Sequence, residues 1–498
     1  MIGAGPGDPG LLTLRGAELL SRADVVLYDG LSNAEILSHA PRAEHICVGK
    51  HGQSRIWTQD EINAEMLRHA IGGARVARLK GGDPAVFART AEEAQSLREA
   101  GIPFEIVPGI TAALAAGSYA GIPITHRRYA SAVALVTGHE EPGKAESAID
   151  WQSLATFPGT LVVYMGVTTA RTWTSALIDA GKSPATPTAI LRRCSLPDQK
   201  SIHCRLDEVA GHLTPATKFR PPVIVIVGEV TQLAESMAWY ENRVLFGQTV
   251  LVTRSEQQAS EVTSVLRELG AEVLEQPAIE ISKLEDFTSL DAFIESLTPN
   301  QPASTDVLIF SSRNGVTYFL DRMLELGHDM RLLASLKIGV VGKRTAERLG
   351  EYHLRPDFVP DDFSALALAK QLAPIAPGKR FVLVRASRGP DTLCEALQQA
   401  GGRVSQVVAY QHRDVEVASD AIMQKMERSE IDWVTVTSAA IAHSLARMLG
   451  PAMKSAKLAS LSPAITGLLE ELGYEVAAQA KEATMQSLIE AIGSFQNR

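Results

Sequence analysis

Residues 78–93 read RLKGGDPAVFARTAEE, and this stretch decides how the first half of the chain is interpreted. It begins at the end of an apolar and basic run, Ala74–Lys80, which predicts a short buried strand. Two glycines, Asp83 and a proline follow. A helix is predicted from about Ala91, with acidic residues in its first turn, where the helix dipole favours carboxylates. A strand that ends in Gly-Gly-Asp-Pro exposes main chain beside one fixed carboxylate, which suits a ligand site, although an ordinary strand-to-helix turn is the alternative.

Length and composition limit the class of protein. The 498 residues are typical of roughly three domains, and 45% apolar residues are normal for a globular chain. The net charge of −9 argues against a nucleic-acid or membrane-surface binder. No apolar run approaches the roughly 18 residues of a membrane span, and the first residues do not resemble a secretory signal. The scattered cysteines favour a reducing cytoplasm and argue against a metal site; they are Cys47, Cys194, Cys204 and Cys394.

A second glycine-rich loop, Gly3–Gly7, precedes a predicted helix over Leu11–Leu20. A glycine loop before a helix is typical of a phosphate or nucleotide site, but its spacing is not the GxGxxG of dinucleotide-binding proteins. A strand should precede such a loop, and only Met1 and Ile2 stand ahead of it. We therefore expect a shortened first strand, and we expect apolar residues joined ahead of Met1 to raise stability.

The first half alternates predicted strands with helices, which indicates an α/β fold. Glycines, hydroxyl residues and charges follow many strands, at the ends where open α/β sheets bind ligands. Asp29 ends the second strand, where a Rossmann fold holds a ribose; this supports an NAD-linked oxidoreductase as an alternative function. The predicted strands are 23–28, 45–49, 74–80, 103–108, 133–137, 160–165 and 222–228.

A series of short motifs gives a more specific interpretation. In order, they are GAGPGDPGLLTL, YD at 28–29, VGK at 48–50, RLKGGDP, VPGITAA, AGIPITHR, VTGH, YMG and VIVIVGEV. This order resembles the uroporphyrinogen-III C-methyltransferases of the tetrapyrrole methylase family over about residues 1–240. The resemblance implies a homodimer that uses S-adenosyl-L-methionine and releases S-adenosyl-L-homocysteine. It also implies two α/β domains, of about 1–121 and 122–240, with the active site between them.

The resemblance implies roles for individual residues. Asp29 matches the general base, Lys50 the proton donor, and Arg89 and Glu92 further charged groups at the tetrapyrrole. Two departures, YDGLS for YDxLV and ART for GRG around Arg89, lie at the edge of this pocket. The cofactor positions are Pro6, Gly81, Gly82, Asp83, Val86, Thr111, Ala112 and Met165, with Cys194 at a position where related sequences often have glycine. The substrate positions are Arg127, Arg128 and His139.

These residue types suit the implied chemistry. Transfer of a methyl group from a sulfonium to a pyrrole carbon depends mainly on positioning. A base must take the pyrrole N–H proton, and Asp29 could do so if burial raises its pKa. Arginines pair with the substrate's carboxylates in a bidentate manner. The implied product is precorrin-2, methylated at C2 and C7, on the way to sirohaem or cobalamin, and no metal is required.

After a predicted linker at 241–247, the strand and helix pattern restarts at Gln248. Residues 251–281 resemble 383–411, and 307–320 resemble 433–446. Each segment contains a strand followed by a hydroxyl-rich loop and a helix. This internal similarity predicts two α/β lobes whose helix N-termini and hydroxyls bind carboxylates. The alternative is that these hydroxyls only cap the helices.

The second half carries its own ordered motifs: LVTR, IFSSRNGV, VVGKRTAERL, LVRASRGPDTL, VVAYQ, VTVTS, LSPAIT and LGYEV. Their order resembles uroporphyrinogen-III synthase over about residues 248–498. The resemblance implies a two-lobed α/β fold, with one lobe formed by 248–282 plus 413–498 and the other by 283–412. The reaction would cyclise hydroxymethylbilane to uroporphyrinogen III, with inversion of ring D and loss of water.

Tyr410 matches the tyrosine that helps the hydroxyl leave as water in this family. A phenol is a weak acid, with a usual pKa of about 10, so its contribution should be modest. The alternative for this half is a domain that binds a tetrapyrrole without catalysis. The residues predicted to bind the substrate's carboxylates are Ser311, Ser312, Lys343, Thr345, Thr437 and Ser438.

Overall fold

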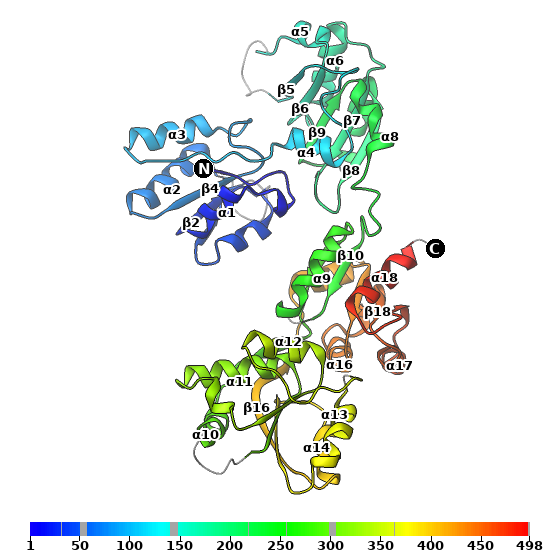
Figure 1. The fold of residues 1–498 in the computed structure, drawn as a ribbon. Coiled ribbons are helices and arrows are strands. Elements are labelled where there is room, and N and C mark those ends of the chain that lie inside the picture. Colours follow the sequence, from blue (N-terminus) through cyan, green and yellow to red (C-terminus); the bar gives the residue numbers. More distant parts are fainter. Residues whose placement is uncertain are drawn as a thin grey trace. The chain divides into compact units, whose positions relative to one another are not determined.

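The computed structural model in Figure 1 describes residues 1–30, 32–49, 57–139, 148–217, 219–254, 256–297, 305–362 and 364–496. For residues 256–261 and 496 it describes the backbone alone. The chain divides into two compact units: one holds residues 1–250 and two short later segments, and the other holds most of residues 251–492. The described residues form four sheets, each accompanied by helices, and this confirms the α/β class. The domain and lobe boundaries stay predictions.

The first sheet contains the strand of the RLKGGDP motif. Its strands are all parallel, in the order β1 (Ile2–Gly3), β4 (Val76–Lys80), β2 (Val25–Tyr28) and β3 (Glu44–Cys47). Apolar clusters cover both faces, because Ile2 and Leu79 pack with Leu20, whereas Leu27 packs with Met66 and Leu97. Its helices are η1 (Pro9–Leu11), α1 (Leu14–Ser21), η2 (Ala34–His39), α2 (Gln59–Ile71) and α3 (Thr90–Glu99). The next helix, α4 (Ala112–Tyr119), packs against the second sheet.

The predicted strand at Pro103–Pro108 is wrong except at one residue. Val107 forms a parallel bridge with Ile2; its N–H donates to the Met1 carbonyl (2.9 Å) and its carbonyl accepts from the Gly3 N–H (3.1 Å). The rest of this segment has no strand assignment, since β1 is two residues long and offers a ladder partner only there.

The second sheet completes the first half and is mixed. Its order is β5 (Val133–Thr137), β6 (Thr160–Tyr164), β9 (Val223–Val227), β7 (Pro187–Arg192) and β8 (Lys200–Arg205). Only β5 and β6 are parallel among these neighbours. The helices are α5 (Trp151–Thr156), α6 (Ala170–Asp179), η3 (Leu206–Glu208), α7 (Val209–His212), η4 (Pro215–Thr217), η5 (Glu229–Leu233) and α8 (Ala234–Met237).

The third sheet combines two distant parts of the chain. Its order is β11 (Glu272–Glu275), β10 (Thr249–Val252), β17 (Trp433–Val436), β18 (Lys457–Ser460) and β19 (Val476–Gln479). The chain leaves this sheet after β11 and returns to it at β17, so two separate stretches of the chain build it. Strand β12, inside the 248–282 segment predicted for this lobe, pairs instead with β16 in the fourth sheet. The accompanying helices are α9 (Glu256–Glu268), α15 (Asp420–Glu427), α16 (Ala439–Met448), η8 (Gly450–Ser455), α17 (Pro463–Glu471) and α18 (Met485–Gln496).

The fourth sheet is built around the long strand β16 (Arg403–Asp414), which pairs in parallel with β15 and then antiparallel with β12. The order is β12 (Ile279–Ser282), β16, β15 (Arg380–Ala386), β13 (Val307–Phe310) and β14 (Lys337–Val340). The helices are α10 (Thr288–Ser296), α11 (Arg313–Glu325), η6 (Met330–Leu333), α12 (Lys343–Glu351), α13 (Ala365–Leu372), η7 (Ala373–Ile375) and α14 (Thr392–Gln399).

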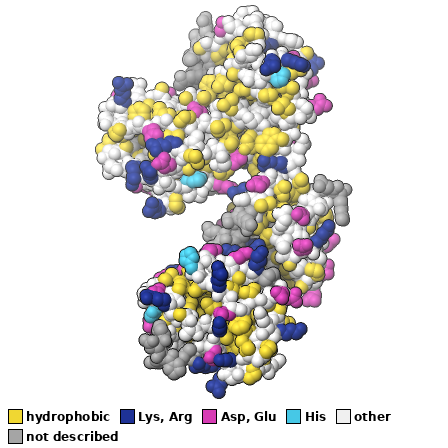
Figure 2. Space-filling model, in the orientation of Figure 1, with side chains coloured by type: hydrophobic (Ala, Val, Ile, Leu, Met, Phe, Trp, Pro, Cys, Tyr) yellow, Lys and Arg dark blue, Asp and Glu magenta, His cyan; other side chains and the backbone are white. Residues whose placement is uncertain are grey.

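Charged side chains of both signs are interspersed over the face of the protein that Figure 2 shows. This mixture accompanies many exposed ion pairs, such as Arg331 with Asp329 and Lys337 with Asp357. In the described part of the chain, no helix has both the length and the apolar character to cross a membrane.

Candidate functional sites

Three loops meet through their main chains at the carboxyl end of the first sheet. The Ala4 N–H donates to the Lys80 carbonyl (2.8 Å), and Gly5 and Gly82 exchange hydrogen bonds of 3.1 and 2.7 Å. The loop after β1 is therefore fixed to the loop after β4. Pro6, predicted to touch the cofactor, is half-buried in the first of these loops, and Gly81 is half-buried in the second.

Asp83 holds the third loop in place. One carboxylate oxygen accepts from the Ala85 N–H (2.7 Å), and the other accepts from the Gly109 N–H, 26 residues away (2.9 Å). Hydrogen bonds to a carboxylate are stronger than those between neutral groups. The aspartate of the GGDP motif thus joins its own turn to the loop that leads into α4.

Glycine is required where these loops touch. A Cβ atom on Gly3 would lie 2.6 Å from the Cα of Gly109, and a Cβ on Gly109 would lie 2.3 Å from the carbonyl oxygen of Gly82. Gly82 has a φ of +70°, which favours glycine. The sequence interpretation assigned glycines to ligand access, whereas Gly3 and Gly109 serve the packing of main chain on main chain.

The loop before α4 is also tied to the second sheet. The Tyr164 hydroxyl accepts from the Ala113 N–H (2.9 Å) and shares a 2.6 Å hydrogen bond with the Thr111 hydroxyl. Met165 follows Tyr164 with a φ of +55° and an exposed fraction of 48%. Thr111 and Met165, both predicted cofactor positions, are thus linked by one tyrosine that sequence reasoning did not single out: Thr111 bonds its hydroxyl and Met165 follows it in the chain.

The remaining predicted cofactor residues belong to, or pack against, one apolar cluster. Val86 and Ala112 are partly buried and pack against the cluster that contains Ala113 and Tyr164. Cys194 is buried in the same cluster, and burial raises the pKa of its thiol to about 12. The thiol is therefore protonated at neutral pH. Whether these residues contact a cofactor stays a prediction.

A buried ion-pair network lies behind Asp29. The guanidinium of Arg78 donates to Asp29 (2.7 Å) and to Glu93 (3.3 Å), and the Lys80 ammonium lies 2.7 Å from the same Glu93 oxygen. Glu93 has no exposed surface, and Arg78 and Lys80 are 4% and 2% exposed. Burial and the neighbouring Arg78 lower the pKa of the Lys80 ammonium. Gln59 is a further neighbour, with its amide 3.3 Å from Glu93.

Sequence analysis missed this network. Arg78 and Lys80 alternate along a strand that was predicted to be buried, so both side chains lie on one face and need an acidic partner. Glu93 in the first turn of α3 supplies it. Asp29 itself is partly buried, with 31% of its side chain exposed. Lys50, the predicted proton donor, lies outside the described residues.

The other charged residues predicted at the tetrapyrrole lie at the surface. Arg89 directly precedes α3 with a φ of +53°, and its guanidinium pairs with Glu92 at 2.6 Å, with both side chains about half exposed. Arg127, Arg128 and His139 are exposed. Asp29 is held from within the protein, whereas these groups can reorient towards a ligand.

In the second half, Tyr410 is enclosed by its neighbours. It is 7% exposed, its ring stacks on Tyr318 with centroids 5.4 Å apart, and its hydroxyl shares a 3.0 Å hydrogen bond with the Ser312 hydroxyl. Burial raises the pKa of the phenol above its ordinary value. A protonated phenol is therefore held at the end of β13, next to Ser311, whose hydroxyl donates to the Val384 carbonyl (3.2 Å).

Two predicted carboxylate-binding hydroxyls act as helix caps. Ser312 accepts from the Gly315 N–H at the start of α11 (3.0 Å), and Ser438 accepts from the Ile441 N–H at the start of α16 (3.2 Å). The capping alternative is confirmed for both, and binding stays a prediction. Of the other candidates, Lys343 is exposed and 3.9 Å from Glu347, Thr345 is buried, and Thr437 is half-buried. Lys343 and Thr345 follow β14, beside β13, whereas Thr437 and Ser438 follow β17 in the other sheet.

Two family models match the chain in succession. Residues 1–210 match the tetrapyrrole (corrin/porphyrin) methylases, and residues 260–490 match uroporphyrinogen-III synthase HemD. The chain is 36% identical over 441 residues to the porphyrin biosynthesis protein HemD of Ruminiclostridium josui, which covers 88% of this chain and 86% of that protein. Both family resemblances inferred from the sequence motifs are thereby confirmed.

Further similarities concern the first half. An S-adenosyl-L-methionine-dependent uroporphyrinogen III methyltransferase of Methanosarcina barkeri is 46% identical over 234 residues, or 47% of this chain and 91% of that protein. A solved structure of the uroporphyrin-III C-methyltransferase of Thermus thermophilus, complexed with S-adenyl homocysteine, matches with 42% identity and a TM-score of 0.41, and covers 47% of this chain and 97% of that one. The chain belongs to the tetrapyrrole methylase family in its first half and to the uroporphyrinogen-III synthase family in its second half.

Proposed function

We propose that this chain is a bifunctional enzyme of tetrapyrrole biosynthesis. Its second half cyclises hydroxymethylbilane to uroporphyrinogen III, with inversion of ring D and loss of water. Its first half methylates that product at C2 and C7 to give precorrin-2. The observation that carries the proposal is the succession of the two families on one chain, which the R. josui porphyrin biosynthesis protein matches over most of its length.

The first half fits S-adenosyl-L-methionine. The three joined loops present main-chain groups beside the Asp83 carboxylate, and the neighbouring exposed side chains Phe87, Leu114 and Met165 are apolar. Such a surface suits a ligand with hydroxyls, charged groups and an apolar ring. The cofactor would lie against Pro6, Gly81, Gly82, Asp83 and Thr111, and when bound it supplies an electrophilic methyl group. The M. barkeri relative, which depends on this cofactor by name, supports the assignment. The NAD-linked alternative lacks such support.

Asp29 is our candidate for the base of the methylation. Its described contact with Arg78 uses one oxygen, so the second oxygen would accept the pyrrole N–H proton. Arg78 fixes the orientation of the carboxylate and is held in turn by Glu93. Arg89, Arg127 and Arg128 would bind the substrate's carboxylates, because exposed guanidinium groups can turn towards an anionic ligand. Lys50 would return a proton.

We expect the Tyr410→Phe variant to lose only part of its cyclising activity. The phenol is a weak acid whose pKa burial raises further, so its loss should reduce kcat by less than about 100-fold, the lower limit for an efficient general acid. The measurement is the rate of uroporphyrinogen III formation from hydroxymethylbilane. The Ser312→Ala variant is measured beside it, because it removes the partner of the hydroxyl but leaves the phenol; since it also removes the cap of α11, its Tm is measured with its rate. A loss of more than about 1000-fold in Tyr410→Phe would make the phenol the principal acid and refute this assignment.

Three finer assignments complete the proposal. The first half would form a homodimer, as the methylase resemblance implies. The protein would work in the cytoplasm, because free cysteines suit a reducing compartment. Precorrin-2 would pass to enzymes that oxidise the ring and insert the metal of sirohaem or cobalamin.

The whole chain tests the proposal in one reaction. Purified protein is incubated with hydroxymethylbilane, with or without S-adenosyl-L-methionine, and the products are separated by isomer and mass. We expect type III uroporphyrinogen without the cofactor and a dimethylated product with it. Formation of the type I isomer alone would refute the synthase assignment, and the second half of the chain would then be a domain that binds a tetrapyrrole without catalysis. Type III product without methylation would remove the methyltransferase assignment.

A further inference from the structure

The loop after β1 is held on its outer side by residues that no prediction singled out. The Asp8 N–H donates to the Ser195 hydroxyl (3.0 Å), and one Asp8 carboxylate oxygen accepts from the Tyr119 hydroxyl (2.8 Å). The other oxygen accepts from the Gly10 N–H (2.8 Å) and caps η1. Main chain and side chain of Asp8 are thus both tied to residues far away in the sequence. Because Asp8 lies two residues after Pro6, these bonds fix the loop that is predicted to touch the cofactor.

Ser195 lies after β7 in a strained conformation that its neighbours maintain. Its φ is +71°, in the left-handed region that disfavours residues with a side chain. The Gln199 amide oxygen accepts from the Ser195 N–H (3.0 Å), and the Ser195 carbonyl accepts from the Tyr240 hydroxyl (3.1 Å). Ser195, Gln199 and Tyr240 are only 2%, 3% and 4% exposed. Such strain persists where the surroundings determine it, and here it directs the Ser195 hydroxyl at the loop after β1.

Tyr240 belongs to the segment after α8, which packs on the end of α4. The rings of Tyr240 and Tyr119 meet edge to face, with their centroids 4.8 Å apart. The Trp239 indole N–H donates to the Ser118 carbonyl (2.8 Å), and the Arg243 guanidinium lies over the Tyr240 ring, 4.9 Å from its centroid. These contacts on both sides of Tyr240 hold its hydroxyl in the place from which it donates.

Both tyrosines are hydrogen-bond donors at neutral pH. Burial, followed by the hydrogen bond to Asp8, raises the pKa of Tyr119, and burial raises the pKa of Tyr240 to about 12. Neither phenol ionises near pH 7, so each keeps its single O–H. Replacement by phenylalanine therefore removes one donor and retains the ring with its packing.

We propose that Tyr240 and Tyr119 are positioning residues for the methyl donor. Tyr240 acts through Ser195 and Tyr119 acts directly on Asp8, so together they hold the outer side of the loop after β1. The loop after β4 holds its other side. The segment after α8 thereby sets the affinity of the first half for S-adenosyl-L-methionine, although it lies outside every predicted cofactor position. The inference rests on the proposed function of the first half.

The experiment measures binding of S-adenosyl-L-homocysteine to the full chain by calorimetry, in Tyr240→Phe, Ser195→Ala and the double variant. We expect each single variant to bind about tenfold more weakly, the effect of one lost hydrogen bond. Since Tyr240 acts through the Ser195 hydroxyl, the double variant should also bind about tenfold more weakly. Tyr119→Phe acts on the Asp8 carboxylate, so its effect should add to that of Ser195→Ala. In Tyr240→Phe the KM for S-adenosyl-L-methionine should rise, with kcat unchanged.

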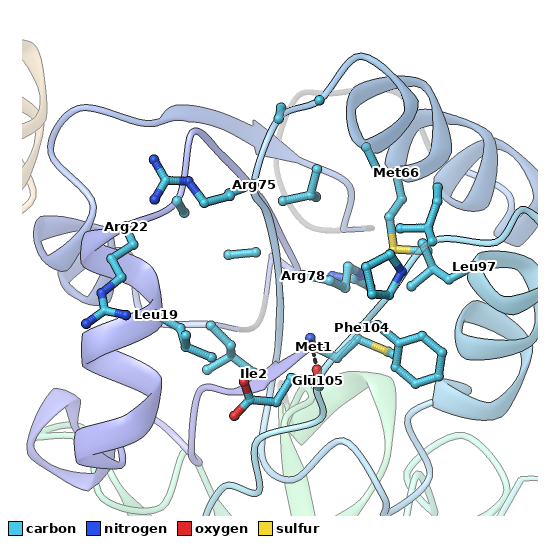
Figure 3. A pocket seen from close by; sticks show the side chains of 18 residues that line it. Met1, Ile2, Leu19, Arg22, Met66, Arg75, Arg78, Leu97, Phe104 and Glu105 are labelled. Atoms are coloured by element: carbon cyan, nitrogen blue, oxygen red, sulfur yellow. Dashed lines mark hydrogen bonds between the residues drawn. The ribbon is translucent and has the colours of Figure 1, made fainter.

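Hydrogen exchange gives a second measurement that needs no cofactor. The Asp8 amide hydrogen should exchange at least about tenfold faster in Tyr240→Phe and in Ser195→Ala than in the unmodified chain. Met66→Ala is the control for general destabilisation. Met66 and Leu97 lie at one side of a pocket of about 510 Å³ beside the amino end of β4 (Figure 3), and Met66 packs in the core of the first sheet. This variant should lower Tm and leave the affinity unchanged.

The outcomes separate this inference from the proposed function. Unchanged affinity in Tyr240→Phe and Ser195→Ala, in a chain that binds S-adenosyl-L-homocysteine, would overturn the inference alone. A loss of about a hundredfold in the double variant would show two independent effects and would also overturn it. An equal loss of affinity in Met66→Ala would show that any destabilisation suffices. No binding to the unmodified chain would overturn the proposed methyltransferase, and the inference with it.

Discussion

The Asp83→Ala variant is expected to bind S-adenosyl-L-homocysteine at least about 100-fold more weakly than the unmodified chain. Asp83 accepts hydrogen bonds from Ala85 and from Gly109, and it thereby joins the loop after β4 to the loop before α4. Each bond to a charged acceptor is worth about 1.5–3 kcal/mol, and 1.4 kcal/mol is a factor of ten in affinity. The measurement is isothermal titration calorimetry with the full chain.

The Asp83→Asn variant refines this test. Asparagine keeps one acceptor oxygen, so we expect an intermediate affinity and a smaller change in Tm. The Asp24→Ala variant is a control. Asp24 also accepts a backbone hydrogen bond, from Arg75, but it lies at the amino end of β2, whereas Asp83 lies at the carboxyl end of the sheet. Unchanged affinity in Asp83→Ala would contradict a cofactor site at this loop. Binding of NAD in place of S-adenosyl-L-homocysteine would replace the methyltransferase assignment with the NAD-linked oxidoreductase alternative.

The Glu93→Ala variant is expected to lose about 3–5 kcal/mol of unfolding free energy. Glu93 is fully buried and balances the charges of Arg78 and Lys80, which are themselves almost fully buried. Removing one partner of a buried ion pair leaves an uncompensated charge in the interior, which carries a cost of this size. Urea unfolding followed by circular dichroism measures the loss.

The Glu92→Ala variant is the matched control for this measurement. Glu92 precedes Glu93 in the same helix, but its side chain is 49% exposed and pairs with an equally accessible Arg89. Exposed pairs contribute about 0–1 kcal/mol. Similar losses in the two variants would show that helix α3, and not the buried network, determines the effect. A Glu93→Met, Lys80→Met double variant should regain part of the lost stability, because apolar side chains can replace a buried ion pair.

The strand, turn and helix around GGDP could be predicted because local signals agree there. The apolar run forms β4, Asp83 fixes the turn, and α3 begins at Thr90. The same reasoning failed at residues 103–108, where an apolar segment with strand-forming residues has a single bridge. A strand forms only where a neighbouring strand can pair with it. The neighbour here is β1, which is two residues long, and nothing in the sequence of residues 103–108 reveals that length.

The candidate sites were predictable in their chain segments but not in their contacts. The GGDP and ITAA motifs mark loops that the structure joins through Asp83 and Gly109, and Thr111 ties the second loop to Tyr164. Asp29 is only partly buried, and its ion pair with Arg78 could not be read from the sequence, because the two residues are 49 positions apart, one on β4 and the other directly after the neighbouring strand β2. At Tyr410, the sequence indicated the residue, but its stacking on Tyr318 joins elements far apart in the chain. Such long-range pairs follow from packing and not from local pattern.

The direct contact of Gly3 with Gly109 and Gly82 affects how sequence variation at this site should be interpreted. In a library that randomises the three loops, Gly3 and Gly109 would be retained as strictly as Asp83, although neither contributes a functional group. Intolerance to substitution at these loops would then reflect two different constraints: the close approach of main chains, and the chemistry of the side chains. If invariant residues alone were used to assign catalytic residues, Gly3 and Gly109 would be counted among them, although they are invariant only because they lack a side chain.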